Sequence, residues 1–184
     1  SAELRIPLAA ATPEAKRGWL ESVAGVPAGG GTNLASGLDL GLGAVEASRR
    51  AGRAPRVILI SDGLANQGDV SGEGLRGRAA RATAGEYALS TIGVGADFDE
   101  ELMAGLADAG SGNFHYLRNA VNLAEIFSTE LDTARETVAS GVAIRLVPAA
   151  GVVWTDAAGY PVERASDGAF TVRPGTLRVL VPPG

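Results

Sequence analysis

Two patterns of apolar positions alternate along the first 138 residues of the chain. Apolar residues three and four positions apart, flanked by capping residues, predict helices. These helices are expected at 12–23, from 33 onward, and at 73–84, 99–109 and 121–138. Short apolar runs between them predict strands, which are expected at 4–8, 57–61, 87–94 and 113–117. Strands that alternate with helices favour a doubly wound, mostly parallel α/β sheet with helices on both faces.

Individual residues support several of these helices. Thr12 offers a capping hydroxyl, and Pro13 suits the first helical position because it needs no N–H donor there. The second helix is expected to bury a stripe formed by Leu34, Leu38, Leu42 and Val45. The last helix is expected to present one face formed by Ala124, Phe127, Leu131 and Val138.

The pattern changes near residue 140. Short segments of alternating apolar and polar residues follow, separated by Gly, Pro and Asp, and such segments predict antiparallel strands. They are expected at 142–147, 152–154, 169–172 and 177–181. We therefore divide the chain into an α/β unit over 1–139 and a β-rich segment over 140–184, which we expect to be part of a β-sandwich.

Composition excludes several classes of protein. Hydrophobic residues make up 46% and charged residues 20%, as in ordinary globular chains and unlike disordered ones. The sequence has no cysteine, which excludes disulfides, zinc–thiolate sites and cysteine nucleophiles. No apolar stretch approaches 18 residues, so no segment is expected to span a membrane. The net charge of −5, without a basic run, predicts no nucleic-acid partner.

Two segments place oxygen donors where the predicted strands and helices meet. The loop Gly-Gly-Gly-Thr-Asn-Leu at 29–34 brings the hydroxyl of Thr32 to a helix N-terminus. The run Ile-Leu-Ile-Ser-Asp-Gly at 58–63 brings the carboxylate of Asp62 to the carboxyl end of a strand, where open α/β sheets bind ligands. A hydroxyl and a carboxylate suit Mg²⁺ or Mn²⁺, with water or further side chains completing the coordination.

Three stretches of the sequence resemble the von Willebrand factor A (VWA) domain. They are Gly-Gly-Thr-Asn-Leu-Ala-Ser-Gly-Leu (30–38), Val-Ile-Leu-Ile-Ser-Asp-Gly-Leu-Ala-Asn-Gln-Gly (57–68) and Leu-Ser-Thr-Ile-Gly-Val-Gly (89–95). The resemblance is to the bacterial branch similar to inter-alpha-trypsin-inhibitor heavy chains and chloride-channel-regulator proteins. The β-rich segment after residue 140 also fits that branch.

This resemblance implies a metal-ion-dependent adhesion site. It implies that Thr32 and Asp62 bind the cation, with Asp62 often acting through water, and that the cation is Mg²⁺, or else Mn²⁺ or Ca²⁺. The partner is then a protein whose acidic side chain completes the coordination. The neighbouring Gly30, Gly31, Asn33 and Gly63 are expected to contact that partner.

One motif of the family does not occur in these 184 residues. The first strand of a VWA domain ends in Asp-x-Ser-x-Ser, which supplies three ligands, and the chain starts at a point that resembles the turn before the third strand. We therefore expect that the first two strands and first helix come from a complementary chain or segment, which also completes the cation site. Since a lost central strand exposes unpaired backbone groups, the 184 residues are not expected to fold alone.

The expected function is metal-dependent protein binding in adhesion or assembly, and not catalysis. A VWA scaffold without metal is one alternative. A phosphate- or nucleotide-binding enzyme is the other, because a glycine-rich loop that opens a helix can cradle phosphate. Against the enzyme, no Gly-Lys-Ser/Thr sequence and no lysine lies near Thr32, and the single histidine, His115, has no nucleophile partner in a hydrolase motif. The expected location is extracytoplasmic or at the cell surface, with the cytoplasm as the alternative.

Overall fold

The computed structural model describes residues 2–27, 29–48, 54–155 and 162–178. The α/β part contains α1 (Pro13–Ala24), α2 (Leu34–Ala47), β1 (Arg56–Ser61), α3 (Gly72–Ala84), β2 (Ala88–Val94), α4 (Glu100–Ala109), β3 (Ser111–Leu117), the 3₁₀ helix η1 (Ala120–Asn122) and α5 (Leu123–Glu136). A second, antiparallel part contains β4 (Thr137–Leu146), β5 (Val162–Arg164) and β6 (Phe170–Arg178).

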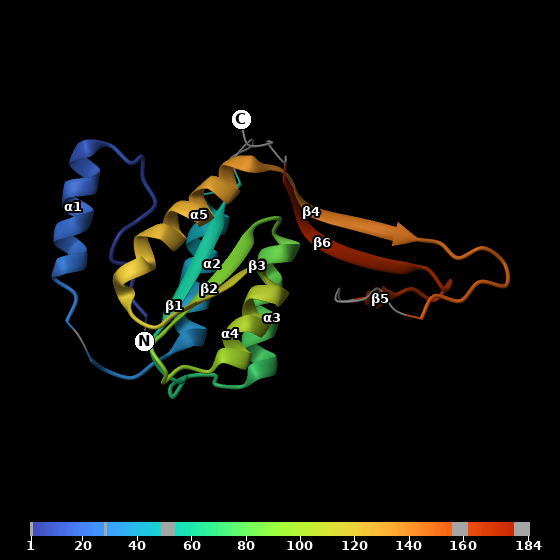
Figure 1. Ribbon diagram of the computed structural model, residues 1–184, viewed down its shortest axis with the longest axis horizontal. Coiled ribbons are helices and arrows are strands. Elements are labelled where there is room, and N and C mark those ends of the chain that lie inside the picture. The colour runs from blue at the N-terminus through green and yellow to red at the C-terminus, as the bar shows by residue number, and fades with distance from the viewer. Residues whose placement is uncertain (1, 28, 49–53, 156–161, 179–184) are drawn as a thin grey trace.

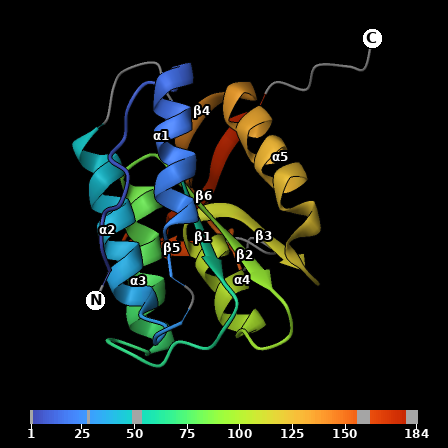
Figure 2. The ribbon, with the colours of Figure 1, turned by 90° about the vertical axis from the view of Figure 1, so that its left-hand side faces the viewer.

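The α/β part is built around a parallel sheet with the strand order β1-β2-β3. β1 and β2 stay in register from the Arg56–Ala88 pair to the Ser61–Gly93 pair. Helices α2, α3 and α4 lie on one side of this sheet and α5 lies on the other (Figures 1 and 2). The middle strand β2 is buried along nearly its whole length, as a strand paired on both edges and covered on both faces should be. The predicted α/β fold and the strands predicted at 57–61, 87–94 and 113–117 are thereby confirmed.

The main apolar core lies between the sheet and the helices α2, α3 and α4. The stripe predicted on α2 is confirmed, because Leu34, Leu38, Leu42 and Val45 are all buried. It packs in one cluster with Leu75 of α3 and Leu106 of α4, and both of these leucines are fully buried. Burial of one such side chain stabilises the fold by about 1.5–3 kcal/mol, so this cluster positions the N-terminus of α2 firmly.

The strand predicted at 4–8 is wrong. Residues 2–12 form neither a helix nor a strand, and Leu4 and Leu8 are both exposed. Pro7 has no N–H to donate to a neighbouring strand, and the exposed leucines gain nothing from an extended pairing. The segment contacts the α/β part through the N–H of Ala2, which donates to the Oγ of Ser36 in α2 at 2.9 Å.

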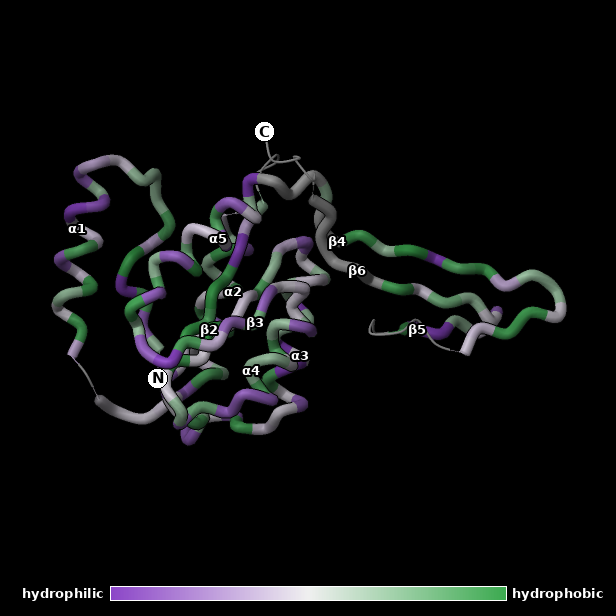
Figure 3. Tube along the Cα trace, in the orientation of Figure 1, coloured by the Kyte–Doolittle hydropathy of each residue, from purple (hydrophilic) through white to green (hydrophobic). Residues whose placement is uncertain are grey.

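The helix predicted at 12–23 is confirmed as α1, but it stands apart from the sheet. Its cap is the one predicted, because the hydroxyl of Thr12 accepts a hydrogen bond from the N–H of Ala15 at 3.2 Å and Pro13 follows. No residue of α1 is buried, and Leu20 is 70% exposed. Figure 3 shows that α1 carries both apolar and polar positions and is set away from the rest of the α/β part. In the described part of the chain, no helix has the length and apolar character needed to cross a membrane.

The face predicted for the last helix is wrong in part. Leu131, which the pattern places on one face with Ala124 and Phe127, is 60% exposed, whereas Glu130 beside it is 1% exposed and Thr133 is also buried. The side chain of Val138 lies outside the described residues. The polar face turns inward because the sheet surface beneath α5 offers hydrogen-bond donors. The helix also ends at Glu136, two residues before the predicted end at 138, and β4 begins at the next residue.

The antiparallel sheet has the order β4-β6-β5 and extends from the α/β part as an arm (Figure 1). Two strands expected at 169–172 and 177–181 are one strand, β6, up to residue 178, and 179–181 lie outside the described residues. The strand predicted at 152–154 is wrong, because the N–H of Val152 closes a turn onto the carbonyl of Ala149 at 3.0 Å. The domain boundary at 139/140 and the β-sandwich stay predictions.

Candidate metal centre

The two segments singled out in the sequence meet in the structure. The N–H of Thr32 donates to the Oδ1 of Asn66 at 2.8 Å. The carbonyl oxygen of Thr32 accepts hydrogen bonds from the N–H groups of Asn66 and Gln67, at 3.0 and 3.2 Å. The loop before α2 and the loop after β1 are therefore joined at Thr32, beside the carboxyl end of β1.

The hydroxyl of Thr32 faces the Asp62–Gly63 turn. A Cβ placed on Gly63 would lie 3.6 Å from the Oγ1 of Thr32, so this hydroxyl reaches the residue that follows Asp62. Asp62 itself is exposed at the end of β1. Ser61 is buried, and its hydroxyl donates to the carbonyl oxygen of Gly63 at 2.9 Å. Ser61 therefore shapes the turn, while Asp62 is exposed and Thr32 is half-buried beside it.

Two glycines allow the loop before α2 (the first loop) to pack closely against the loop after β1 (the second loop). Gly30 has a φ of 100°, a backbone conformation that side chains other than glycine rarely adopt. A Cβ on Gly31 would lie 2.1 Å from the Nε2 of Gln67 and 2.9 Å from the Oδ1 of Asn66. Gly30 and Gly31 are both predicted to contact a partner. Gly31 lies against the second loop, and the positive φ of Gly30 favours glycine at that position.

Asn33 begins α2. Its Oδ1 accepts a hydrogen bond from the N–H of Ser36 at 2.9 Å, which satisfies one of the free donors of the first helical turn. A Cβ on Gly68, whose φ is 70°, would lie only 2.6 Å from that same Oδ1. The side chain of Asn33, predicted to contact a partner, is thus used inside the protein as a helix cap that packs against the end of the second loop.

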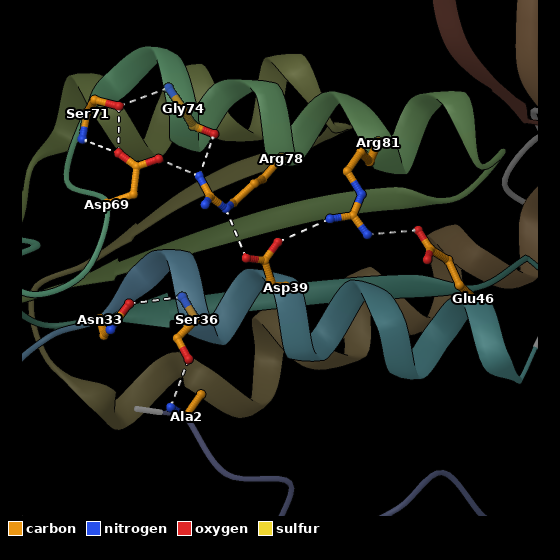
Figure 4. Close-up of polar contacts among 10 residues, drawn as sticks. All are labelled: Ala2, Asn33, Ser36, Asp39, Glu46, Asp69, Ser71, Gly74, Arg78 and Arg81. Atoms are coloured by element: carbon orange, nitrogen blue, oxygen red, sulfur yellow. Dashed lines mark hydrogen bonds and ion pairs between the residues drawn. The ribbon is translucent and has the colours of Figure 1, made fainter.

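Asp69 anchors the far end of the second loop (Figure 4). Its Oδ1 accepts hydrogen bonds from the hydroxyl of Ser71 at 2.6 Å and from the N–H of Ser71 at 3.0 Å, and its Oδ2 accepts one from Arg78 at 2.6 Å. The Ser71 hydroxyl, and after it Arg78, lower the pKa of Asp69 to about 2. Arg78 also contacts Asp39 of α2 at 3.1 Å. The second loop is therefore tied to α2 at Asp69 as well as at Thr32.

These contacts leave few side chains for a cation. Within the described residues, no group of three or more His, Cys, Asp or Glu side chains is arranged to hold a metal ion. Asn66 accepts from Thr32, and the Asp69 carboxylate is engaged by Ser71 and Arg78. The two oxygen ligands predicted from the sequence, the hydroxyl of Thr32 and the carboxylate of Asp62, both lie at this edge of the sheet.

A second polar centre, which the sequence analysis missed, lies under α5. The Oε1 of Glu130 contacts the Nε2 of His115 at 2.7 Å and accepts from the Nδ2 of Asn113 at 2.8 Å. Its Oε2 accepts from the hydroxyl of Ser90 at 2.8 Å and from the guanidinium of Arg56. One buried carboxylate thus joins α5 to all three strands of the parallel sheet, and it accounts for a structural role of His115.

The hydrogen bonds to Glu130 decide its ionisation. Burial alone would raise the pKa of this carboxyl group, because it disfavours the charged form. The donors His115, Asn113, Ser90 and Arg56 outweigh burial and lower the pKa to about 2. Glu130 is therefore ionised over the physiological pH range, and its charge is compensated inside the protein by Arg56.

One feature of the sequence could have revealed this centre. Glu130 lies three residues after Phe127 and four before Ala134, so it falls on the stripe that faces the sheet. An acid on such a stripe is more informative than the apolar residues around it, because a buried carboxylate needs donors.

Comparisons with known proteins concern mainly the α/β part of the chain. The family model described as "von Willebrand factor type A domain" matches residues 3–129. The uncharacterized protein YfbK of Escherichia coli (strain K12) is 28% identical over 114 residues, which cover 61% of this chain and 20% of YfbK. The chain therefore spans about a fifth of the length of that curated relative.

Two solved structures show the same fold. The structure of "von Willebrand factor type A from Catenulispora acidiphila" aligns with a TM-score of 0.70 at 20% identity, covering 94% of this chain and 42% of that one. The conserved hypothetical protein BatB from Bacteroides thetaiotaomicron aligns with a TM-score of 0.54 at 16% identity, covering 65% of this chain and 69% of that one.

Proposed function

Because the chain belongs to the von Willebrand factor type A domain family, we propose that it is a metal-ion-dependent protein-binding module that acts in adhesion or assembly and not in catalysis. The observation that carries this proposal is the junction of the Thr32 loop with the Asp62–Gly63 turn. It brings the hydroxyl of Thr32 to the turn that carries Asp62, at the carboxyl end of β1, where sheets of this kind bind ligands.

The proposed cation is Mg²⁺, with Mn²⁺ or Ca²⁺ as the other hard cations that oxygen ligands accept. Mg²⁺ takes six oxygens in nearly octahedral geometry, and Thr32 and Asp62 supply at most a minority of them. We place the remaining protein ligands in an Asp-x-Ser-x-Ser strand outside these 184 residues. We call the 184 residues together with such a strand the completed protein.

The proposed partner is a protein that offers an acidic side chain. A carboxylate is a hard oxygen ligand and would replace water on the cation. The exposed position of Asp62 at the end of β1 leaves this edge of the sheet accessible to such a partner. The same proposal includes an extracytoplasmic or cell-surface location. It also includes a complementary strand that lies beside β1 and supplies the remaining ligands.

A scaffold without metal is the second candidate function. It is favoured by the direct hydrogen bonds between the two loops, in which the backbone of Thr32 contacts Asn66 and Gln67. In that case the same edge would bind a protein partner through direct polar contacts, and added Mg²⁺ would change nothing.

Substitution of either oxygen donor distinguishes the two candidates. In the completed protein, we expect Thr32→Ala and Asp62→Ala each to weaken Mg²⁺ binding about 10–100-fold, because each removes an oxygen that holds the cation or its water. Both should leave the fold intact, since neither side chain is part of the apolar core. Calorimetric titration with Mg²⁺ and circular dichroism measure the two effects.

Two matched variants serve as controls. Thr129 is an exposed threonine whose hydroxyl donates within α5, and Asp108 is an exposed aspartate in α4. Thr129→Ala and Asp108→Ala should bind Mg²⁺ as the unaltered protein does. Equal Mg²⁺ affinity in all four variants would place the metal site elsewhere, and no binding by the unaltered completed protein would favour the scaffold without metal.

A further inference from the structure

Thr32 lies in a part of the backbone that secondary structure does not hold. It precedes Asn33, the cap of α2, and it follows Gly29 and Gly30, which both have positive φ angles. Glycine permits these conformations and also permits many others, so the glycines alone do not fix the direction of the next side chain. A hydroxyl that binds a cation has to be held in place, because Mg²⁺ demands nearly ideal geometry.

The contacts of Asn66 hold Thr32 from both sides of its peptide backbone. The Oδ1 of Asn66 accepts from the N–H of Thr32 at 2.8 Å, and the N–H of Asn66 donates to the carbonyl oxygen of Thr32 at 3.0 Å. One residue thus closes a pair of opposed hydrogen bonds around Thr32. With the backbone fixed at both its donor and its acceptor, rotation about χ1 is the main freedom left to the Thr32 side chain.

The surroundings of Asn66 are shaped for this contact. A Cβ on Gly31 would lie 2.9 Å from the Oδ1 of Asn66, so a larger residue at position 31 would require this oxygen to shift from its hydrogen bond with Thr32. Asn66 is itself exposed, and neither hydrogen bond joins it to the apolar core. Its side chain therefore contributes to the loop junction and not to the stability of the core.

We propose that Asn66 is the positioning residue of the metal site, and that it sets the affinity for the cation by directing the hydroxyl of Thr32 toward it. This inference rests on the proposed function. Asn66 acts through Thr32 and does not bind the metal itself. Any residue at position 66 that lacks an acceptor at the place of Oδ1 leaves the N–H of Thr32 without this partner.

The neighbouring Gln67 provides a matched control. Both residues carry exposed amide side chains, and both donate a backbone N–H to the carbonyl oxygen of Thr32. Replacement by alanine keeps both backbone bonds, while the bond from the N–H of Thr32 is lost only in Asn66→Ala. A difference between Asn66→Ala and Gln67→Ala therefore reports on that one contact.

The test uses the completed protein and Mg²⁺ alone as the probe. We expect Asn66→Ala to weaken Mg²⁺ binding about 10-fold, as the loss of an outer contact to a ligand commonly does, and Gln67→Ala to weaken it less than 2-fold. Without metal, the amide hydrogen of Thr32 should exchange faster in Asn66→Ala than in Gln67→Ala. In a Thr32→Ala background, Asn66→Ala should have no further effect on Mg²⁺ affinity, because it acts through the hydroxyl that is already absent.

The outcomes separate this inference from the proposed function. If the unaltered completed protein binds Mg²⁺ and Thr32→Ala weakens it, but Asn66→Ala behaves like Gln67→Ala, the role of Asn66 is wrong and the metal site stands. An additional loss of affinity from Asn66→Ala in the Thr32→Ala background would also overturn it, since the effect would then not pass through Thr32. If the unaltered completed protein binds no Mg²⁺, both proposals fail.

Discussion

Replacement of Glu130 by alanine is expected to lower the free energy of unfolding of the completed protein by about 3–5 kcal/mol, as the removal of one partner from a buried ion pair does. The change leaves the guanidinium of Arg56, which is 10% exposed, without its carboxylate. It also removes the acceptor from Ser90, Asn113 and His115, and each unsatisfied buried donor adds its own cost. Urea unfolding at neutral pH measures the effect.

A control and a pH series identify the cause. Glu125 lies on the same helix and is exposed, so Glu125→Ala should cost less than about 1 kcal/mol, the value of an acid near a helix N-terminus. Because the pKa of Glu130 is lowered from 4.5 to about 2, its ionised form stabilises the fold fully above pH 4.5, and this contribution is lost as the pH falls through about 2. Stability of Glu130→Gln should therefore fall less steeply between pH 4.5 and 2. A Glu130→Ala effect as small as that of Glu125→Ala would contradict the buried centre.

Replacement of Gly112 by alanine is expected to destabilise the completed protein by about 3 kcal/mol or more, at the upper end of the range for overpacking. A Cβ at Gly112 would lie 2.1 Å from the carbonyl oxygen of Leu89 and 2.7 Å from the backbone nitrogen of Ser90. These are backbone atoms of the central strand and cannot move aside as a side chain would. The glycine lies in a bulge, where Leu89 pairs with Ser111 but Thr91 pairs with Phe114.

A glycine in open space provides the comparison for Gly112. Gly77 lies within α3, and a Cβ there would meet no atom within 4 Å. Gly77→Ala should stabilise the protein by about 0.4–1 kcal/mol, because alanine favours the helix and restricts the unfolded chain. The midpoint temperature of thermal unfolding should rise in Gly77→Ala and fall in Gly112→Ala. A Gly112→Ala variant as stable as the unaltered protein would show that β2 and β3 are not packed as closely as described.

The fold of the α/β part could be predicted because its signals are local and strong. The apolar run at 57–60 and the stripe from Leu34 to Val45 are periodic and marked at their ends by capping residues and glycine. The segment at 4–8 shows where this reasoning fails. It has the composition of a strand, but a strand forms only where a neighbour accepts its backbone hydrogen bonds, and periodicity carries no information about neighbours.

The same distinction applies to the sites. Thr32 and Asp62 could be proposed because each stands at the junction of a predicted strand or loop with a helix, and the structure brings their segments together. Asn66 could not, because its contact with Thr32 spans 34 residues of the chain. Glu130 could be noticed only as an acid on the inward stripe of α5, and the spacing does not give its partners, of which Arg56 lies 74 residues away. Such contacts depend on the tertiary packing and leave no regular spacing in the sequence.

The most direct test of the central claim is a calorimetric titration with Mg²⁺ of two proteins, the isolated 184-residue chain and the completed protein with its Asp-x-Ser-x-Ser strand. Mg²⁺ needs six oxygens, and the proposed site takes only the neutral hydroxyl of Thr32 and the carboxylate of Asp62 from this chain. The proposal predicts Mg²⁺ binding by the completed protein and weak or no binding by the isolated chain. Equally tight binding by both would contradict it, because the 184 residues would then hold the cation without the added ligands.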